Sequence, residues 1–391
     1  MADSSATDCV LREVAFRSYR AEHTVTVQCT VRPDSGPGQA EGYGTATTEA
    51  VARKKALSEA VERLLACTPF ALIARRPTPR TDRSRGTDPW QRGLRSAPAG
   101  CQVRNYRSLS GEQPRQVPLF WSSPWVAGEE MRSANLAPQA ARLSSTVGWA
   151  VAPSPEAALQ GALYELTELL NYGAFLYRCL AAPRERPAPG GGPEPHEEGR
   201  TQTVPISWAT RTPTILAVTR SSDRLMPATG IGSGTTASEA AERAFLELAQ
   251  AETLWRANST AVPAERYFMR RFEKWPLLRR CAALDFDLGE HAGPFDDGPH
   301  PSPLGALESR AIEVWADPGA VDISGADLRR TRLCFAHVVS DPQPLLGLVR
   351  AGIPVFDTGE VRKILVCPRR ARSADLSPSG RVAHSGRPTR A

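Results

Sequence analysis

The sequence predicts an α+β fold in which helices pack on mostly antiparallel sheets, with internal pseudo-repeats, in one continuous domain. Two observations carry this prediction: a helical pattern that recurs three times, and short segments with strand character between and after those helices. Hydrophobic residues make up 41% and charged residues 23% of the 391 residues, which is normal for a globular protein. No run of about eighteen apolar residues occurs, so we expect no membrane-spanning helix.

The basic charge of the chain is a weak indication of nucleic-acid binding. The formal net charge is +6, but only four of the 48 basic residues are lysines, which together with 34 prolines fits GC-rich coding bias. Basic runs interleaved with aromatic residues are absent. A nucleic-acid partner is therefore not expected and stays a minor alternative.

Cysteine and histidine usage points to a reduced protein without a zinc site. The eight cysteines form no CxxC pair, and the six histidines form no HExxH pattern. Scattered single cysteines in a chain of this length are typical of the cytoplasm. The N-terminus lacks the basic region and apolar stretch of a secretory signal, which agrees with a cytoplasmic location.

Strands are predicted from two kinds of apolar pattern. Val25, Val27, Cys29 and Val31 alternate with polar residues, as in a half-buried strand. More continuously apolar segments predict buried strands at residues 213–220, 332–340 and 363–368.

Segments rich in proline, glycine and charge divide the chain. We expect flexible insertions at about residues 75–100, 182–199 and 291–304. The same composition predicts a disordered tail at 369–391. The resulting organisation is an N-terminal segment, 1–39, followed by one domain, 40–368.

The repeated element is a helix, predicted at residues 47–65, 154–172 and 238–254. Each copy begins with Ser or Thr at an N-cap position and carries a glutamate in its first turn. Each then has a pair of residues with Glu-x-x-Glu or Glu-x-x-Gln spacing: Glu59 with Glu62, Glu165 with Glu168, and Glu247 with Gln250.

This spacing has a physical consequence, because residues i and i+3 lie on one face of a helix. Like charges on that face repel by a few tenths of a kcal/mol, so a bound cation relieves them. Mg²⁺ in nucleotide sites is held by a few carboxylates together with phosphate oxygens. Three such helices brought together would form a magnesium site. The alternative is that the glutamates are merely the solvated stripes of three amphipathic helices.

Turns of small residues precede the helices, at 42–44, 144–148 and 230–234. Glycine lets the backbone approach a phosphate closely, and a helix N-terminus favours anions. No GxxxxGK[ST] phosphate loop occurs in the chain. Ordinary strand-to-helix connections are the alternative interpretation of these turns.

The order of these segments resembles the YcaO superfamily over about residues 40–365. The family's first block, a GKG turn before an ExxER helix, is similar to residues 42–44 followed by 58–63. Its second block, SNGxAxG before another ExxER helix, is similar to residues 146–150 and 165–168. Its third block, a strand, a Gly-Ser turn and an ExxQ helix, is similar to residues 214–220, 232–233 and 247–250. Residues 320–345 are similar to its closing strands.

Several residues depart from the family pattern. Tyr43 replaces the usual lysine, Thr146 and Val147 replace Ser-Asn, and Leu169 replaces the second arginine. A C-terminal PxPxP is absent from the sequence. The departures leave the carboxylate helices in place, and the missing PxPxP favours a product other than an azoline.

The resemblance implies a YcaO-type fold and an enzyme that uses ATP and Mg²⁺. Such enzymes phosphorylate the oxygen of a peptide amide after a nucleophile adds to its carbon, giving an azoline, a thioamide or an amidine. The implied metal ligands are Glu59, Glu62, Glu165, Glu168 and Glu247. The implied nucleotide-binding set adds Gly44, Arg63, Gly148, Ser233 and Gln250. For Arg63, a structural ion pair is an equal alternative to phosphate binding.

The implied partners are a peptide substrate and a separate protein that presents it, either a leader-peptide-binding protein or a TfuA-like protein. A homodimer is implied by the resemblance alone. Two other readings stay open. One is a catalytically impaired YcaO-like scaffold beside an active enzyme, favoured by the altered second block. The other is a generic α/β protein whose repeats are coincidental.

Overall fold

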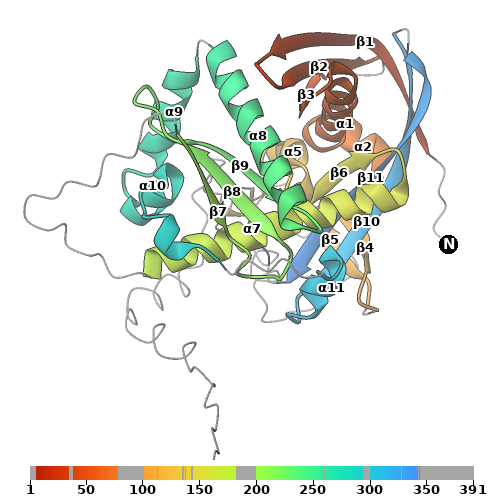
Figure 1. Cartoon of the computed structure of the whole chain (residues 1–391). Coiled ribbons are helices and arrows are strands. Elements are labelled where there is room, and N and C mark those ends of the chain that lie inside the picture. Colours follow the sequence, from red (N-terminus) through yellow and green to blue (C-terminus); the bar gives the residue numbers. More distant parts are fainter. Residues whose placement is uncertain are drawn as a thin grey trace, which may run out of the picture.

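The computed structural model describes residues 6–34, 38–77, 101–111, 113–133, 136, 138–141, 144–181, 200–258, 260–293, 300–326, 328–341 and 343. The predicted strand 363–368, the tail 369–391, the insertion 182–199 and most of the insertion 75–100 lie outside these residues. Within them runs of strands are followed by runs of helices, as is typical of an α+β fold (Figure 1).

In the described part of the chain, the larger sheet has eight strands and is mostly antiparallel. Its strand order is β3-β2-β1-β10-β11-β6, with β4 paired to β10 and β5 to β4. Only the β1–β10 pairing among these is parallel. The strands are β1 (Thr7–Arg20), β2 (Val25–Pro33), β3 (Ala40–Ala46), β4 (Val103–Ser108), β5 (Arg115–Pro118), β6 (Trp149–Ala152), β10 (Glu313–Gly325) and β11 (Leu328–Asp341).

The N-terminal residues are part of this sheet. The sequence analysis set residues 1–39 apart from the domain, whereas β1 pairs with β10 and β2 fills the space between β1 and β3. Val27, Cys29 and Val31 of β2 are fully buried. The difference arises because the parallel pairing joins residues at opposite ends of the chain, which no local pattern reveals.

The smaller sheet has three antiparallel strands, β7 (Thr201–Pro205), β8 (Thr214–Thr219) and β9 (Ala228–Ser233). The predicted strands at 25–31, 213–220 and 332–340 are confirmed as β2, β8 and β11. Shorter helices complete the described fold: α2 (Phe70–Ala74), α4 (Leu119–Ser122), α5 (Pro124–Ser133), α6 (Pro138–Ala141), α9 (Ala261–Arg271), α10 (Pro276–Ala283), the 3₁₀ turn η1 (Gly289–His291) and α11 (Pro303–Glu308).

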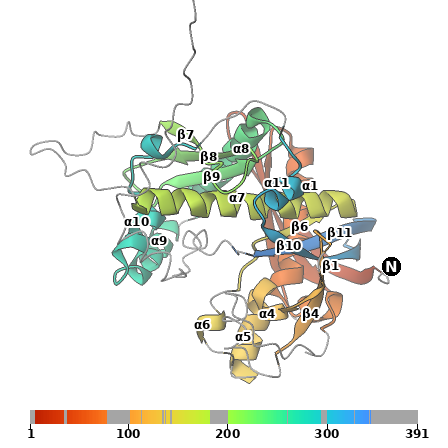
Figure 2. The ribbon, with the colours of Figure 1, turned by 90° about the horizontal axis from the view of Figure 1, so that it is seen from below.

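The three predicted helices are present as α1 (Glu49–Cys67), α7 (Pro155–Ala181) and α8 (Ala237–Ala257). The second ends nine residues later than predicted, because its buried face continues through Phe175, Leu176 and Cys179. Figure 2 shows α7 running across the middle of the molecule, between the three-stranded sheet and strands β10 and β11.

Two of the repeats are closely matched in structure. The unit β2–β3–α1 corresponds to β8–β9–α8, and a buried pair of hydroxyls joins the two strands at the same place in each. Thr26 Oγ1 lies 2.9 Å from Thr45 Oγ1, and Thr214 Oγ1 lies 2.8 Å from Ser233 Oγ. These equivalent contacts confirm the predicted pseudo-repeat as a structural one.

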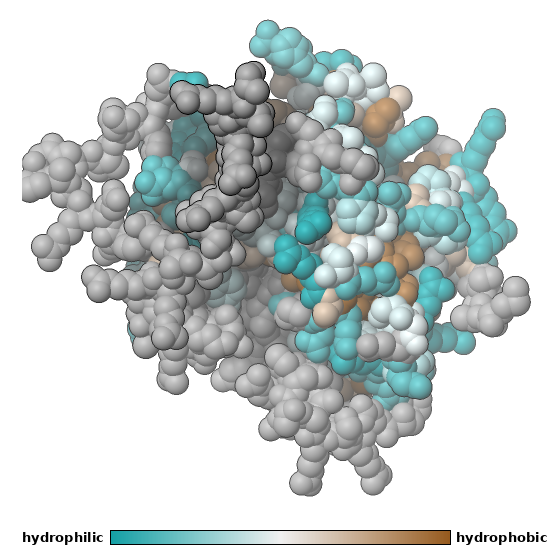
Figure 3. All heavy atoms as spheres, turned by 60° about the horizontal axis from the view of Figure 1, so that its bottom comes forward, coloured by the Kyte–Doolittle hydropathy of each residue, from teal (hydrophilic) through white to brown (hydrophobic). Residues whose placement is uncertain are grey.

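The face of the molecule in Figure 3 shows mostly hydrophilic and neutral atoms in its described part, with small hydrophobic areas between them. In the part of the chain that the structure describes, no helix has the length and apolarity needed to cross a membrane.

Candidate nucleotide and metal site

The three long helices meet through contacts between one repeat and the strand of another (Figure 1). Helix α1 contacts β6, α8 contacts β3, and α7 contacts β9. Two hydrogen bonds mark these junctions: Thr45 Oγ1 donates to Gln250 Oε1 at 3.1 Å, and the main-chain N–H of Ser233 donates to Glu168 Oε1 at 2.8 Å. The second residue of each of these two Glu-x-x-Glu/Gln pairs is thus held by a neighbouring repeat.

The first glutamate of each pair is held by its own repeat. The N–H of Tyr43 donates to Glu59 at 2.9 Å, and the N–H of Ile231 donates to Glu247 at 2.7 Å. In the second repeat the N–H of Gly148 donates to Glu165 at 3.1 Å. Each carboxylate is therefore oriented by a backbone amide rather than left to rotate in solvent.

The carboxyl groups influence one another electrostatically. Burial raises the pKa of Glu62 to about 8, with Arg63 opposing and Glu59 adding to the shift. Burial followed by repulsion from Glu62 and Glu168 raises the pKa of Glu165 well above its usual value. The four glutamates at the junction of the helices therefore behave as one interacting group: Glu62, Glu165, Glu168 and Glu247.

Glu168 links two parts of this group. Burial and then the charge of Glu247 raise the pKa of Glu168 to about 8, while the N–H of Ser233 and the charge of Arg243 oppose the shift. Glu168 and Glu165 keep partial solvent accessibility, and Glu247 is exposed. Carboxyl groups that are partly desolvated yet reachable from solvent can exchange protons for a cation.

Within the described ranges, no three histidine, cysteine or acidic side chains converge closely enough to hold a metal ion by themselves. The donor set still fits magnesium, which is usually bound by one or two carboxylates together with phosphate oxygens. Oε1 of Glu165 and Oε2 of Glu168 take no hydrogen bond from the described residues. Two oxygens of this group are thus available as ligands.

The sequence analysis singled out Arg63 and missed two other cations. Arg63 Nη2 lies 3.2 Å from Glu59 Oε1, an ion pair within one helix. Lys55 and Arg243 occupy equivalent positions, one turn before Glu59 and Glu247. Burial and the charge of Arg243 lower the pKa of Lys55, whose Nζ donates to the carbonyl of Thr45 at 3.2 Å. A basic residue four positions before each of these glutamates is the sequence signal that could have found them.

The glycines before the first and third helices do not lie in turns as expected and have a packing role. Gly42, Gly44, Gly230 and Gly232 lie within strands β3 and β9, not in turns. A Cβ on Gly44 would come within 2.3 Å of the Ala52 carbonyl oxygen. Their small size is required for the strand to approach its own helix, so it is not in itself evidence of phosphate binding.

The altered residues of the first two blocks keep their backbone contacts. The N–H of Tyr43 binds Glu59, while its hydroxyl donates to Glu41 at 3.2 Å. Gly148 is in a turn, as expected, with φ of +82°, and its N–H binds Glu165. The substitutions at Tyr43 and Val147 therefore leave these two amide-to-carboxylate contacts in place.

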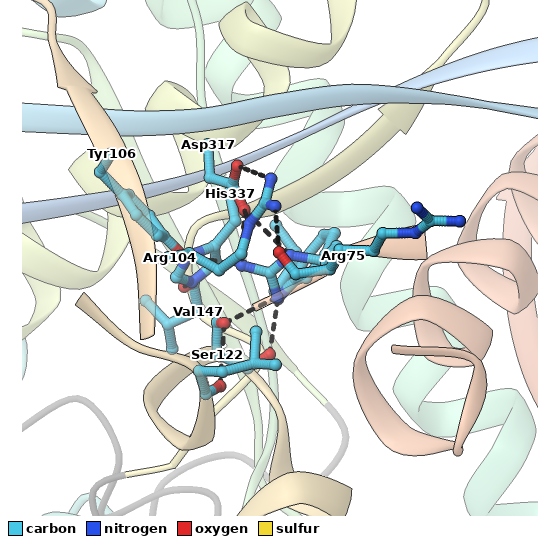
Figure 4. A network of polar contacts seen from close by, with 10 residues as sticks. Arg75, Arg104, Tyr106, Ser122, Val147, Asp317 and His337 are labelled. Carbon is cyan, nitrogen blue, oxygen red and sulfur yellow. Dashed lines mark hydrogen bonds and ion pairs between the residues drawn. The ribbon is translucent and has the colours of Figure 1, made fainter. Parts of the chain in front are cut away.

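A buried polar network lies behind the Val147–Gly148 turn (Figure 4). Arg75 and Asp317 are 2.9 Å apart, and their side chains are 0% and 3% exposed. Arg104 binds the other oxygen of Asp317 at 2.8 Å. Burial alone would raise the pKa of Asp317, but the two arginines hold it below its usual range.

The same network continues to the turn. Arg75 donates to the hydroxyl of Tyr106 at 2.8 Å, and this hydroxyl lies 2.6 Å from His337 Nδ1. His337 Nε2 lies 3.0 Å from the carbonyl oxygen of Val147. The sequence analysis placed Arg75 in a loop and did not single out the other residues. Single titratable residues inside apolar strands, such as Asp317 and His337, were the available signal.

Similarity to known proteins agrees with this geometry. Residues 43–309 match the family described as YcaO cyclodehydratase, ATP- and Mg²⁺-binding. No curated protein matches the chain significantly. Among solved structures, the YcaO of Methanopyrus kandleri bound with AMPPCP and Mg²⁺ is similar with a TM-score of 0.57 and 18% identity, over 88% of this chain and 90% of that one.

Two further structures share the fold. The E. coli microcin synthetase McbBCD complex with pro-MccB17 bound has a TM-score of 0.51 and 12% identity, over 85% of this chain and 88% of that one. A heterocyclase in complex with substrate and cofactor has a TM-score of 0.50 and 13% identity, over 84% of this chain and 49% of that one. The family match covers more than half of the chain, and the chain therefore belongs to the YcaO cyclodehydratase family, whose cofactors are ATP and Mg²⁺.

Proposed function

We propose that this protein is an ATP- and Mg²⁺-dependent enzyme that activates a peptide amide by O-phosphorylation, in the biosynthesis of a modified peptide. The observation that carries the proposal is the cluster of four interacting carboxyl groups at the junction of three helices, those of Glu62, Glu165, Glu168 and Glu247. A protein without a cation to bind gains nothing from such repulsion. The product is an azoline, a thioamide or an amidine, depending on the nucleophile.

The proposed metal ligands are these four residues and Glu59, and the metal would neutralise charge on the phosphates and align the transferred phosphoryl group. The backbone amides of Tyr43, Gly148 and Ile231 orient three of these carboxylates before any ligand arrives. Such preorganisation lowers the entropy lost on binding. Gln250, held by Thr45, adds a polar group without further negative charge.

The positive residues would face the phosphates. Arg63 is paired with Glu59, and Lys55 and Arg243 lie one helical turn nearer the N-termini of α1 and α8. One turn of helix is about 5.4 Å, so a cationic layer adjoins the acidic one. Gly44, Gly148 and Ser233 are the proposed backbone neighbours of the nucleotide.

The chemistry follows from the poor leaving ability of an amide oxygen. A nucleophile adds to the carbonyl carbon, and the resulting oxyanion attacks the terminal phosphorus of ATP while the bond to ADP breaks. The carbon–oxygen bond then breaks and releases phosphate. A carbon–nitrogen or carbon–sulfur double bond forms as the nitrogen or sulfur loses a proton.

Calorimetric titration of the protein with ATP, with and without Mg²⁺, would test this function. Glu62→Gln and Glu168→Gln should each weaken magnesium-dependent binding at least tenfold, as removal of a metal ligand or its orienting partner typically does. Glu252→Gln is the matched control, because Glu252 lies on α8 but pairs only with exposed Arg256. Binding that is equal in all four proteins would refute the assigned site.

The second candidate is a catalytically impaired scaffold beside an active enzyme, favoured by the substitutions at Tyr43, Thr146, Val147 and Leu169. Nucleotide binding without phosphate release, when peptide substrates and partner proteins are supplied, would support it. By analogy with the McbBCD complex bound to pro-MccB17, we propose a peptide substrate and a partner that presents it. A cytoplasmic location and a homodimer remain predictions.

A further inference from the structure

The peptide unit between Val147 and Gly148 is hydrogen-bonded at both ends. Its carbonyl oxygen lies 3.0 Å from His337 Nε2, and its N–H donates to Glu165 Oε2 at 3.1 Å. A trans peptide is planar, with its C=O and N–H pointing in opposite directions. Fixing the carbonyl on one side therefore fixes the direction of the N–H on the other, toward Glu165.

The hydrogen bonds behind this peptide run in one direction. Burial, reinforced by the charge of Arg75, lowers the pKa of His337 to about 3, so the ring is neutral and carries one proton. That proton is on Nε2, because Nε2 faces a carbonyl oxygen, which only accepts. Nδ1 must then accept from the hydroxyl of Tyr106.

The first donors in this series of hydrogen bonds are equally constrained. Burial raises the pKa of Tyr106 to about 12, so its hydroxyl keeps the proton that it donates to His337. The Tyr106 oxygen in turn accepts from Arg75, whose charge is balanced by Asp317 at 2.9 Å. Donation therefore proceeds from Arg75 through Tyr106 and His337 to the Val147 carbonyl (Figure 4).

The turn has little freedom to adjust if this support is lost. Gly148 has φ of +82°, and a Cβ there would lie 2.3 Å from the Val338 carbonyl oxygen. The N–H of Val338 donates to the Gly148 carbonyl at 2.8 Å, which ties the turn to β11. Rotation of the Val147–Gly148 peptide would break the His337 contact at its carbonyl and the Glu165 contact at its N–H.

We propose that His337 is a positioning residue of the nucleotide site, which orients Glu165 through the Val147–Gly148 peptide. This role rests on the proposed function, since Glu165 is a proposed metal ligand. His337 itself is buried, at 1% exposure, and its ring nitrogens face Tyr106 and the Val147 carbonyl rather than Glu165. Tyr106 and Arg75 support it from behind, while Arg104 acts one step further away, through Asp317.

The test compares His337→Phe with His337→Gln. Phenylalanine keeps the ring shape but neither donates nor accepts, whereas glutamine carries an amide that can donate to the Val147 carbonyl and accept from Tyr106. Val339→Ala is the matched stability control, because Val339 is fully buried two residues along β11, in the apolar cluster that contains Phe120 and Trp315. The probes are Mg²⁺ with AMPPCP, and amide hydrogen exchange at Gly148 in the absence of any nucleotide.

We expect His337→Phe to weaken magnesium-dependent AMPPCP binding roughly tenfold, as loss of an orienting partner does, and His337→Gln to restore most of it. In Glu165→Gln, magnesium-dependent AMPPCP binding should no longer depend on His337, so that adding His337→Phe causes no further loss of affinity. Exchange at Gly148 should accelerate in His337→Phe beyond that in Val339→Ala. Equal exchange in these two variants would overturn the positioning role. If the wild-type protein binds no nucleotide, the proposed function is refuted. The exchange experiment, which uses no nucleotide, still decides whether His337 fixes the Val147–Gly148 peptide.

Discussion

Magnesium-nucleotide binding should depend steeply on pH above neutrality, because the proposed ligands hold protons in the free protein. The pKa values of Glu62 and Glu168 are each raised to about 8, in both cases primarily by burial. Each carboxyl group is then ionised in only about a tenth of molecules at pH 7 and about nine-tenths at pH 9. A cation must displace the remaining protons to bind.

The magnitude follows from these fractions. Affinity should rise roughly tenfold between pH 7 and pH 9 for each carboxyl group that must ionise, and the slope should fall in Glu62→Gln and in Glu168→Gln. The terminal phosphate of the nucleotide loses its last proton near pH 6, so it contributes little in this window. Calorimetry in buffers of different ionisation enthalpy should also detect net proton release on binding.

The sign of the stability change provides an independent check. Unfolded glutamate has a pKa of about 4.3, so between about pH 5 and pH 8 the folded state holds more protons than the unfolded state. The free energy of unfolding of the ligand-free protein should therefore fall as pH rises through this window and level off above it. Saturating Mg²⁺ and AMPPCP should reduce the fall. Affinity that is unchanged from pH 7 to pH 9 in the wild type would refute this reasoning.

Three further predictions follow from individual contacts. Lys55→Ala should weaken binding of AMPPCP, measured by calorimetry, by roughly fivefold or more, as loss of a charge-assisted hydrogen bond does. Lys54→Ala, which removes an equal charge from the neighbouring residue but not from the position equivalent to Arg243, should show little change. Gly232→Ala should destabilise the protein by about 1–3 kcal/mol in denaturant unfolding, because the new Cβ would meet the α8 backbone at 2.4 Å; no loss would contradict the packing argument. Asp317→Asn should cost about 3–5 kcal/mol by the same measurement, because it leaves the buried charge of Arg75 unbalanced; a loss below 1 kcal/mol would contradict that.

The helices were predictable because their signals are local. Helical period and Glu239 in the first turn can both be recognised within a few residues. The N-cap is Thr236, whose hydroxyl accepts from the N–H of Glu239 at 3.2 Å, rather than Ser238, at which the predicted helix began. The recurrence of Glu-x-x-Glu/Gln pairs indicated that the three helices act together. The resemblance to a known family then supplied the fold.

The buried network was not predictable, because its members are far apart in the sequence. Arg75 stands at the end of a short helix and before a proline- and arginine-rich segment, so composition alone assigned it to a loop. Its partner Asp317 lies in β10, and only the tertiary fold brings the two together. The glycines of β3 and β9 were wrongly placed in turns for a related reason: a requirement for close strand–helix packing has the same sequence signature as a phosphate-binding turn.

The pattern of anchors explains why the site and the fold depend on each other. Tyr43 and Ile231 hold the first glutamate of their own repeats, whereas Ser233 holds Glu168 and Thr45 holds Gln250 across repeats. Packing the repeats together thus brings like charges together, at a cost that protonation reduces in the free protein. A ligand that binds only this assembled state stabilises it in proportion to the logarithm of its concentration. Magnesium-nucleotide should therefore act as a structural clamp between repeats as well as a cofactor.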